Sequence, residues 1–156
     1  MWCVPRDPTT LAVMQPWEID ARESIRDLTT RYNSNGDTGR FGEVRKLFHD
    51  DAEMHIEGKP YVGVEEVMTI FTGTKDRISA SDGPPLIRHF TGTHQIDLID
   101  ETNARGRLYF FVTTAIGPDH WGTYMDHYRK GDDGVWRFAR RSVKVEGRSP
   151  NSVFGQ

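Results

Sequence analysis

The sequence predicts an α+β domain, a cone-shaped curved antiparallel sheet closed by three N-terminal helices. Helical and strand patterns are segregated along the chain, with helices and one β-hairpin in the first half and long strands in the second. Three of these strands contain a glycine, which inside a strand marks a bulge or a sharp bend: Gly92, Gly106 and Gly122. Helices that cover such a bent sheet would leave a pocket inside the cone.

The composition is that of one globular domain without a nucleic-acid or membrane partner. The chain has 156 residues, of which 36% are hydrophobic and 28% charged. Its formal net charge of -3 argues against binding to nucleic acid or anionic membranes, which require a basic face. No apolar run approaches the ~20 residues of a membrane-spanning helix. The start of the chain lacks the apolar stretch of a signal peptide, so a cytoplasmic location is expected.

Three segments are expected along the chain: an irregular arm over residues 1–15, a single domain over 16–147, and a polar tail over 148–156. The arm contains two prolines and shows no hydrophobic period. The single cysteine, Cys3, lies in this arm and excludes an internal disulfide. The domain must therefore be stabilised by its hydrophobic core.

The first helix is expected to begin at Pro16, because proline is favoured at the first helical position and acidic residues follow it. Apolar residues then recur at helical spacing over about five turns, as far as Tyr32. The dipeptide Asn35-Gly36 is expected to end this helix. A second, shorter helix is expected over residues 39–48, where apolar residues again gather on one side.

A β-hairpin and a third helix follow. Residues 52–57 alternate as a strand does, and a tight turn leads into a short strand at residues 61–62. Apolar residues at helical spacing over 64–71 predict the third helix, ended by Gly73. Residues 74–85 are expected to form one long loop, either a lid or a plain surface connection.

Four long antiparallel strands complete the domain, over residues 86–99, 104–116, 120–130 and 134–146. The second of them is apolar on both faces, because Leu108, Phe110 and Val112 alternate with Tyr109 and Phe111. One face can pack under the helices, and the other must then be covered by protein. A homodimer or homotrimer is therefore expected, formed through the convex face of the sheet.

His89 is the residue on which the chemistry of the chain is expected to depend. It lies on the first long strand, and an imidazole with an ordinary pKa of about 6.5 exchanges protons near neutral pH. Most strand histidines only pack or face solvent, so a catalytic role needs a partner. Asp37, at the end of the first helix, is a possible partner, although it could instead cap the next helix.

Several groups of residues share an order with a known family. They are Arg31-Tyr32 followed by Asp37, residues 47–53, Gly63 before a helix, Arg88-His89 on a strand, and residues 122–126 and 133–141. Over about residues 17–146 this pattern resembles the SnoaL-like branch of the nuclear-transport-factor-2-like superfamily. The resemblance implies a cone-shaped barrel with a deep apolar pocket, assembled as a dimer or trimer.

The resemblance also implies site residues. Scytalone dehydratase, bile-acid 7α-dehydratase and hexachlorocyclohexane dehydrochlorinase use a His-Asp pair to abstract a proton, and the two positions match His89 and Asp37. A strand arginine of the dehydrochlorinase corresponds to Arg141. Where scytalone dehydratase has a further histidine, this chain has Thr113 or Thr114, which argues against scytalone itself as the substrate.

In this scheme His89 is the base, and Asp37 fixes its tautomer and stabilises the imidazolium. Four further residues are candidates for contacting the substrate, as donors to a leaving group or at the pocket mouth: Tyr32, Tyr124, Arg141 and Trp121. All four also suit structural roles. These are, in the same order, a core position on the first helix, a hydrogen bond within the wall, an ion pair with a surface acid, and packing at an interface.

No metal or cofactor is expected. His89 and His94 are five residues apart on one strand, which places them on opposite faces unless a bulge intervenes. No cysteine or carboxylate completes a ligand set at a familiar spacing. A glycine-rich phosphate loop is also absent from the sequence.

The expected function is that of a cofactor-independent lyase, of the dehydratase type, or an isomerase that acts on a small apolar, cyclic molecule. Cyclisation, as in polyketide cyclases, needs the same base and is the nearest alternative. A rival from another class is a non-catalytic ligand-binding or assembly domain, similar to the small subunit of ring-hydroxylating dioxygenases. A missing contact between His89 and Asp37, or a filled pocket, would favour that rival.

Overall fold

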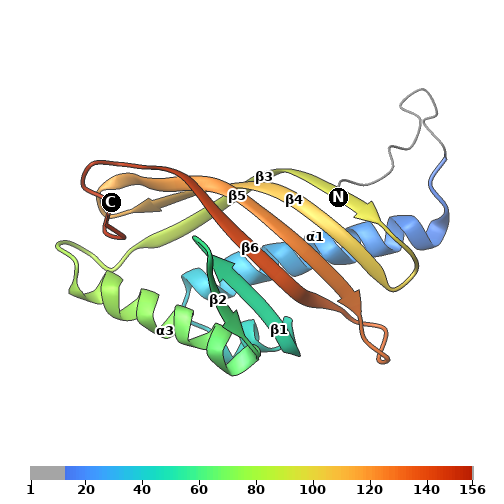
Figure 1. The fold of residues 1–156 in the computed structure, drawn as a ribbon. Helices are drawn as coiled ribbons and strands as arrows, with labels where there is room; N and C mark the ends of the chain where they lie inside the picture. Colours follow the sequence, from blue (N-terminus) through green and yellow to red (C-terminus); the bar gives the residue numbers. More distant parts are fainter. Residues whose placement is uncertain (1–12, 156) are drawn as a thin grey trace.

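The computed structural model describes residues 13–155, which form helices on one side of a single sheet (Figure 1). The helices are α1 (Pro16–Asp37), α2 (Phe41–Arg45) and α3 (Val64–Ala80). The strands are β1 (Phe48–Ile56), β2 (Lys59–Val62), β3 (Ile87–Leu98), β4 (Asn103–Thr114), β5 (Gly117–Lys130) and β6 (Trp136–Arg148). Residues 1–12 of the arm expected at the start of the chain lie outside the described residues.

The sheet has the strand order β2-β1-β6-β5-β4-β3. All neighbouring strands are antiparallel except β1 and β6, which run parallel. The strand register shifts between Gly92 and Gln95 and again between Trp121 and Gly122, at two of the glycines that predicted bends. A side chain at Gly122 would collide with the backbone carbonyl of Lys144, so only glycine allows this approach of β6. The predicted α+β fold with a curved sheet is confirmed.

Helix α1 runs along the concave side of the long strands (Figure 1). It begins at Pro16, as predicted, where Gln15 and Glu18 form a capping box in which the Gln15 N–H donates to the Glu18 carboxylate at 2.8 Å. Its apolar stripe, which ends at Tyr32, is buried against the sheet. The helix ends at Asp37, one residue beyond the expected Asn35-Gly36, and this places a carboxylate beside strand β3.

Two helix boundaries differ from the prediction. Helix α2 is much shorter than the expected residues 39–48, because Phe48 already pairs with Phe138 of β6. Helix α3 continues past Gly73 to Ala80. More than half of residues 74–85, expected to form a loop, are therefore helical, and the loop is shorter than predicted. Glycine inside a helix lowers helix stability by about 1 kcal/mol relative to alanine. Burial of Ile78, which is 5% exposed, offsets that cost.

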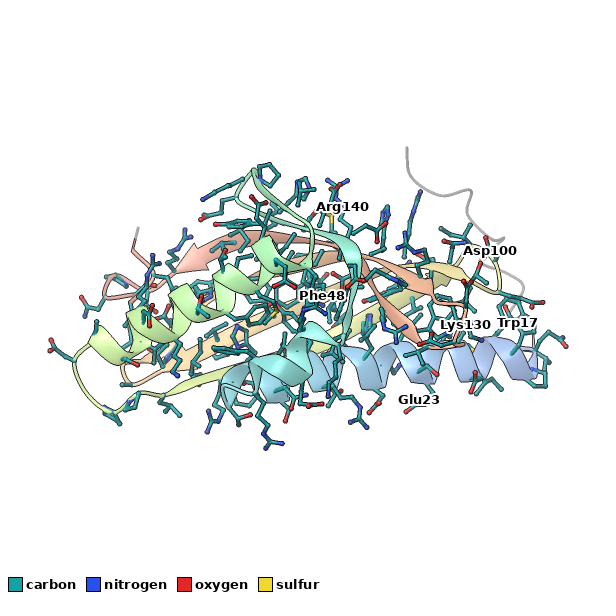
Figure 2. All side chains as sticks on the ribbon, turned by 90° about the horizontal axis from the view of Figure 1, so that it is seen from below. Trp17, Glu23, Phe48, Asp100, Lys130 and Arg140 are labelled. Carbon is teal, nitrogen blue, oxygen red and sulfur yellow. The ribbon has the colours of Figure 1, made fainter. Side chains whose placement is uncertain are left out.

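The hydrophobic core lies between the helices and the concave face of the sheet. Phe48 lies within this layer, whereas Arg140 points away from the helices (Figure 2). The alternation predicted for β4 is present: Leu108, Phe110 and Val112 are buried, while Tyr109 and Phe111 are 46% and 38% exposed on the convex face. None of the helices in residues 13–155 has the length and apolar character that a bilayer crossing requires.

Candidate functional site

The two residues proposed from the sequence as a catalytic pair are in direct contact. The Nδ1 atom of His89 lies 2.6 Å from Oδ1 of Asp37, and the backbone N–H of His89 donates to Oδ2 of the same carboxylate at 2.8 Å. Strand β3 is at the edge of the sheet, so this N–H is free of any strand partner on that side. The end of α1 and the edge of β3 are thereby held together by one carboxylate.

This contact fixes the role of each nitrogen in the His89 ring. Nδ1 donates its proton to Asp37, whose side chain is only 7% exposed, and Nε2 has no partner among the described residues. In the neutral ring Nε2 therefore carries a lone pair. The alternative that Asp37 caps the next helix does not hold, because α2 is preceded by Arg40 and has no side-chain cap.

Both residues line a cavity of about 710 Å³, a size typical of small-molecule sites. Its walls come from α1, α3, the concave face of the sheet and the C-terminal segment, residues 149–155, which follows β6. Much of this lining is apolar, from Met54, Ile56, Ile70, Phe71, Ile87 and Val143. Such a lining favours a ligand that is at least partly apolar.

Two of the predicted substrate contacts, Tyr32 and Tyr124, lie in the cavity wall. Burial raises the pKa of the Tyr32 hydroxyl and raises that of Tyr124 well above its ordinary value. Both phenols therefore stay protonated and can donate a hydrogen bond. Phe110 stacks on Tyr124 with a ring-centroid distance of 4.4 Å, which holds that ring in one orientation.

Arg141, predicted to contact the substrate, does not line the cavity. The side chain is 1% exposed and makes two hydrogen bonds to Asp126, at 2.8 and 2.7 Å. Its guanidinium lies 4.2 Å from the ring centroid of Tyr32 and 4.1 Å from that of Tyr124. The paired acid is fully buried rather than on the surface. Arg141 thus makes cation–π contacts with both tyrosine rings and helps to hold them in position.

Trp121, the other predicted contact, is also outside the cavity. It follows His120 on β5, and successive side chains of a strand point to opposite faces. The ring lies on the convex face, over Gly147 of the neighbouring strand, where any side chain at that glycine would collide with it. Trp121 is 39% exposed, which fits the alternative role at an interface.

A bulge changes the predicted position of His94. Thr93 has a φ of 49°, and the register shift around it turns His94 toward the helices, on the same side as His89. Its Nε2 lies 3.2 Å from the hydroxyl of Tyr128, which donates to Asp126 at 2.7 Å. Even so, the described residues contain no group of three or more histidines, cysteines or carboxylates that could hold a metal ion.

The buried position of His94 predicts a loss of stability in acid. Burial lowers its pKa from 6.5 to about 4, so between about pH 6.5 and 4 the unfolded chain binds a proton that the folded one does not. This contribution to stability is complete above pH 6.5 and decreases as the pH falls toward 4. Between pH 7 and 5 the free energy of unfolding, measured with urea, should fall by about 1–2 kcal/mol more in the wild type than in His94→Gln, the lower figure allowing for solvent screening of this partly buried ring. Equal losses in the two proteins would contradict this assignment.

A second histidine-aspartate pair, whose histidine lines the cavity, was not predicted from the sequence. His120 lines the cavity, and its Nδ1 lies 2.7 Å from Oδ1 of Asp119. Strand β5 begins at Gly117, earlier than expected, and this brings Asp119 into the sheet. The C-terminal segment, expected to be an irregular polar tail, also lines the cavity through Phe154, whose ring centroid lies 4.8 Å from that of His120. The adjacent Asp-His after a turn is the only sequence signal for this pair.

Comparison with solved structures identifies the same fold elsewhere. A candidate scytalone dehydratase of Novosphingobium aromaticivorans has 21% identity and a TM-score of 0.74, over 87% of this chain and 91% of that chain. The hexachlorocyclohexane dehydrochlorinase LinA-type3 of Novosphingobium barchaimii has 18% identity and a TM-score of 0.72, over 86% of this chain and 92% of that one. A protein of unknown function from Nostoc punctiforme, described as having a cystatin-like fold, has 17% identity and a TM-score of 0.71, over 90% and 98%.

At these identities the solved structures show the shared fold alone. Among curated proteins, none matches the chain. The model of the SnoaL-like domain family, in contrast, matches residues 17–142, which is most of the chain. The protein therefore belongs to the SnoaL-like domain family.

Proposed function

We propose that the protein is a cofactor-independent lyase that eliminates water or halide from a small apolar, cyclic molecule. The observation that carries this proposal is the orientation of His89. Its Nδ1 is bound to Asp37 at 2.6 Å, and its Nε2, which has no partner within residues 13–155, belongs to a ring on the wall of a cavity of about 710 Å³. A base with a fixed tautomer beside a cavity that is apolar over much of its wall is an arrangement suited to proton abstraction from carbon.

The reaction follows from the roles of these groups. Nε2 of His89 takes the proton of a C–H bond next to an activating group, and the electron pair of that bond forms the new double bond. The leaving group departs with the electrons of its own bond to carbon and accepts a hydrogen bond from the hydroxyl of Tyr32 or Tyr124, both of which line the cavity. The imidazolium that results is stabilised by Asp37 and returns its proton to water.

The similar solved structures support this reaction class by their names, since a dehydrochlorinase and a candidate scytalone dehydratase are both elimination enzymes. The open cavity and the His89–Asp37 contact favour an enzyme over a purely structural domain. Isomerisation and cyclisation use the same base, so the product decides among the three reactions.

The proposal is tested by incubating the protein with a panel of cyclic alcohols and cyclic halides, each with an acidic C–H bond beside the carbon that bears the leaving group. Formation of a conjugated alkene is followed by ultraviolet absorption, and products are identified by mass. We expect loss of water or halide from at least one compound. Products of unchanged mass would show that the reaction is isomerisation or cyclisation instead of elimination. No conversion of any compound would count against a catalytic role.

We also infer that the protein forms a homodimer or homotrimer through the convex face of its sheet. Phe90, Phe111 and Trp121 lie side by side in one row across three strands, and each is more than a third exposed. A contiguous apolar patch of this kind usually marks an interface. Sedimentation velocity at tens of micromolar protein should show the oligomer. Phe111→Lys should dissociate it, while Ile19→Lys, at an exposed site on α1, should not. A monomeric wild type would contradict the inference.

A further inference from the structure

His89 and His120 lie in one row across the concave face of the sheet. His89 of β3 is paired with Val112 of β4, and Val112 is paired with His120 of β5. Residues two strands apart are about 10 Å apart at the backbone. Both histidines line the cavity, with Val112 buried between them. A ring system bound in the cavity can therefore contact one imidazole at each side.

The buried carboxylate of Asp119 fixes the tautomer of His120. Asp119 is 0% exposed and accepts hydrogen bonds from Thr114, His120, Ser152 and the backbone N–H of Val153, at 2.7 to 3.1 Å. Burial alone raises the pKa of this carboxyl, but its hydrogen bonds, led by those from Ser152 and His120, bring it below its ordinary value. Asp119 is therefore ionised, and Nδ1 of His120 donates to it.

The charged or titratable groups that act on His120 most strongly are Asp119 on its own strand, His89 on β3 and Arg148 on β6. Burial lowers the pKa of His120, and His89 and Arg148 lower it further, against the opposing effect of Asp119. The ring is consequently neutral near pH 7. It is also held in place by Phe110 and Phe154, whose ring centroids lie 5.9 and 4.8 Å away.

A neutral imidazole with its proton on Nδ1 is a hydrogen-bond acceptor at Nε2. In His120 this nitrogen has no partner among residues 13–155. A carbonyl or ether oxygen has no proton to offer it, whereas a hydroxyl does. The leaving oxygen of an elimination needs a donor rather than an acceptor, so the hydroxyl that His120 can bind is one that the reaction retains.

We propose that Nε2 of His120 accepts a hydrogen bond from a retained hydroxyl of the substrate. The molecule on which His89 acts is then a cyclic alcohol, phenol or enol whose hydroxyl lies on the side of the ring opposite the C–H bond that is broken. His120 is a positioning residue in this scheme, and the protons of the reaction stay with His89. The inference rests on the proposed function, because it takes the cavity to be the substrate site.

The experiment measures binding rather than turnover, so its failure is distinguishable from failure of the proposed function. The probes are 2-naphthol and 2-methoxynaphthalene, which share a ring system and differ in the hydroxyl proton. Dissociation constants are measured by calorimetry for the wild type, for His120→Phe, and for His127→Phe as the control at an exposed position on the same strand. A lost hydrogen bond to a buried partner typically costs about tenfold in affinity.

We expect the wild type and His127→Phe to bind 2-naphthol about tenfold more tightly than its methyl ether, and His120→Phe to bind the two alike. A preference retained in His120→Phe would assign the hydroxyl to another acceptor, His89 included, and overturn the proposal. Equal binding of the two probes by the wild type, or no binding of 2-naphthol, would also overturn it.

A measurement on the wild type covers the case in which His120→Phe does not fold. Two-bond proton–nitrogen NMR spectra report the tautomer of each histidine. At pH 7 His120 should show a protonated Nδ1 and an unprotonated Nε2, and the Nε2 resonance should shift when 2-naphthol is added but not when the methyl ether is added. A protonated Nε2, or an unchanged resonance, would contradict the proposal.

Discussion

Replacement of His89 by alanine is expected to lower kcat/KM for elimination by about 10²- to 10⁴-fold, the range that a general base contributes. The imidazole of His89 lines the cavity and is the base of the proposed reaction, with Asp37 at the end of α1 bound to its Nδ1. Without this side chain, only water is left to accept the proton, and water is a much weaker base. The measurement is steady-state turnover of the compound that the wild type converts.

Two companion variants separate chemistry from folding. His89→Ala leaves Asp37 buried without its imidazole partner, which costs about 1–3 kcal/mol of stability. His89→Asn restores a side-chain N–H near the position of Nδ1 but has no base, so it should fold better and be equally inactive. His127→Ala, at an exposed site on β5, should retain full activity. Activity of His89→Asn or His89→Ala equal to that of the wild type would remove His89 from the mechanism.

Asp37→Asn is expected to be impaired, but about tenfold less than His89→Ala, because the base remains while its orientation and charge support are lost. The amide offers one oxygen where the carboxylate offers two, and Asp37 uses both, toward Nδ1 and toward the backbone N–H of His89. The ring is then free to adopt the tautomer with its proton on Nε2, which cannot accept another.

Turnover of Asp37→Asn is compared with that of Asp97→Asn, an exposed aspartate on β3. The control should match the wild type in activity. Full activity of Asp37→Asn would show that the carboxylate only joins α1 to β3. A loss larger than that of His89→Ala would assign the main chemical role to Asp37 itself.

The fold could be predicted from the sequence because its signals are periodic and local. The stripe that ends at Tyr32 places α1, and the alternation around Phe110 places both faces of β4. The errors occurred where tertiary contacts override local preference. Phe48 joins the sheet where its helical neighbours predicted a helix, and burial of Ile78 extends α3 through Gly73.

The site could be predicted only in part. The contact between His89 and Asp37 was expected from a resemblance, since no local pattern brings together residues 52 positions apart. The direction of Arg141 could not be predicted, because its partner Asp126 lies on another strand. The place of His120 in the cavity depends on the strand register, which spacing along the chain does not reveal.

His89 is expected to remove a proton from carbon inside the cavity. The most direct test of this step is deuterium uptake from D₂O at the activated carbon of 2-tetralone, an apolar cyclic ketone, measured by mass and corrected for uncatalysed exchange. The wild type is predicted to accelerate uptake, with His127→Ala equal to it and His89→Ala at the uncatalysed rate. Uptake at the uncatalysed rate in the wild type, or equal acceleration by His89→Ala, would contradict this expectation.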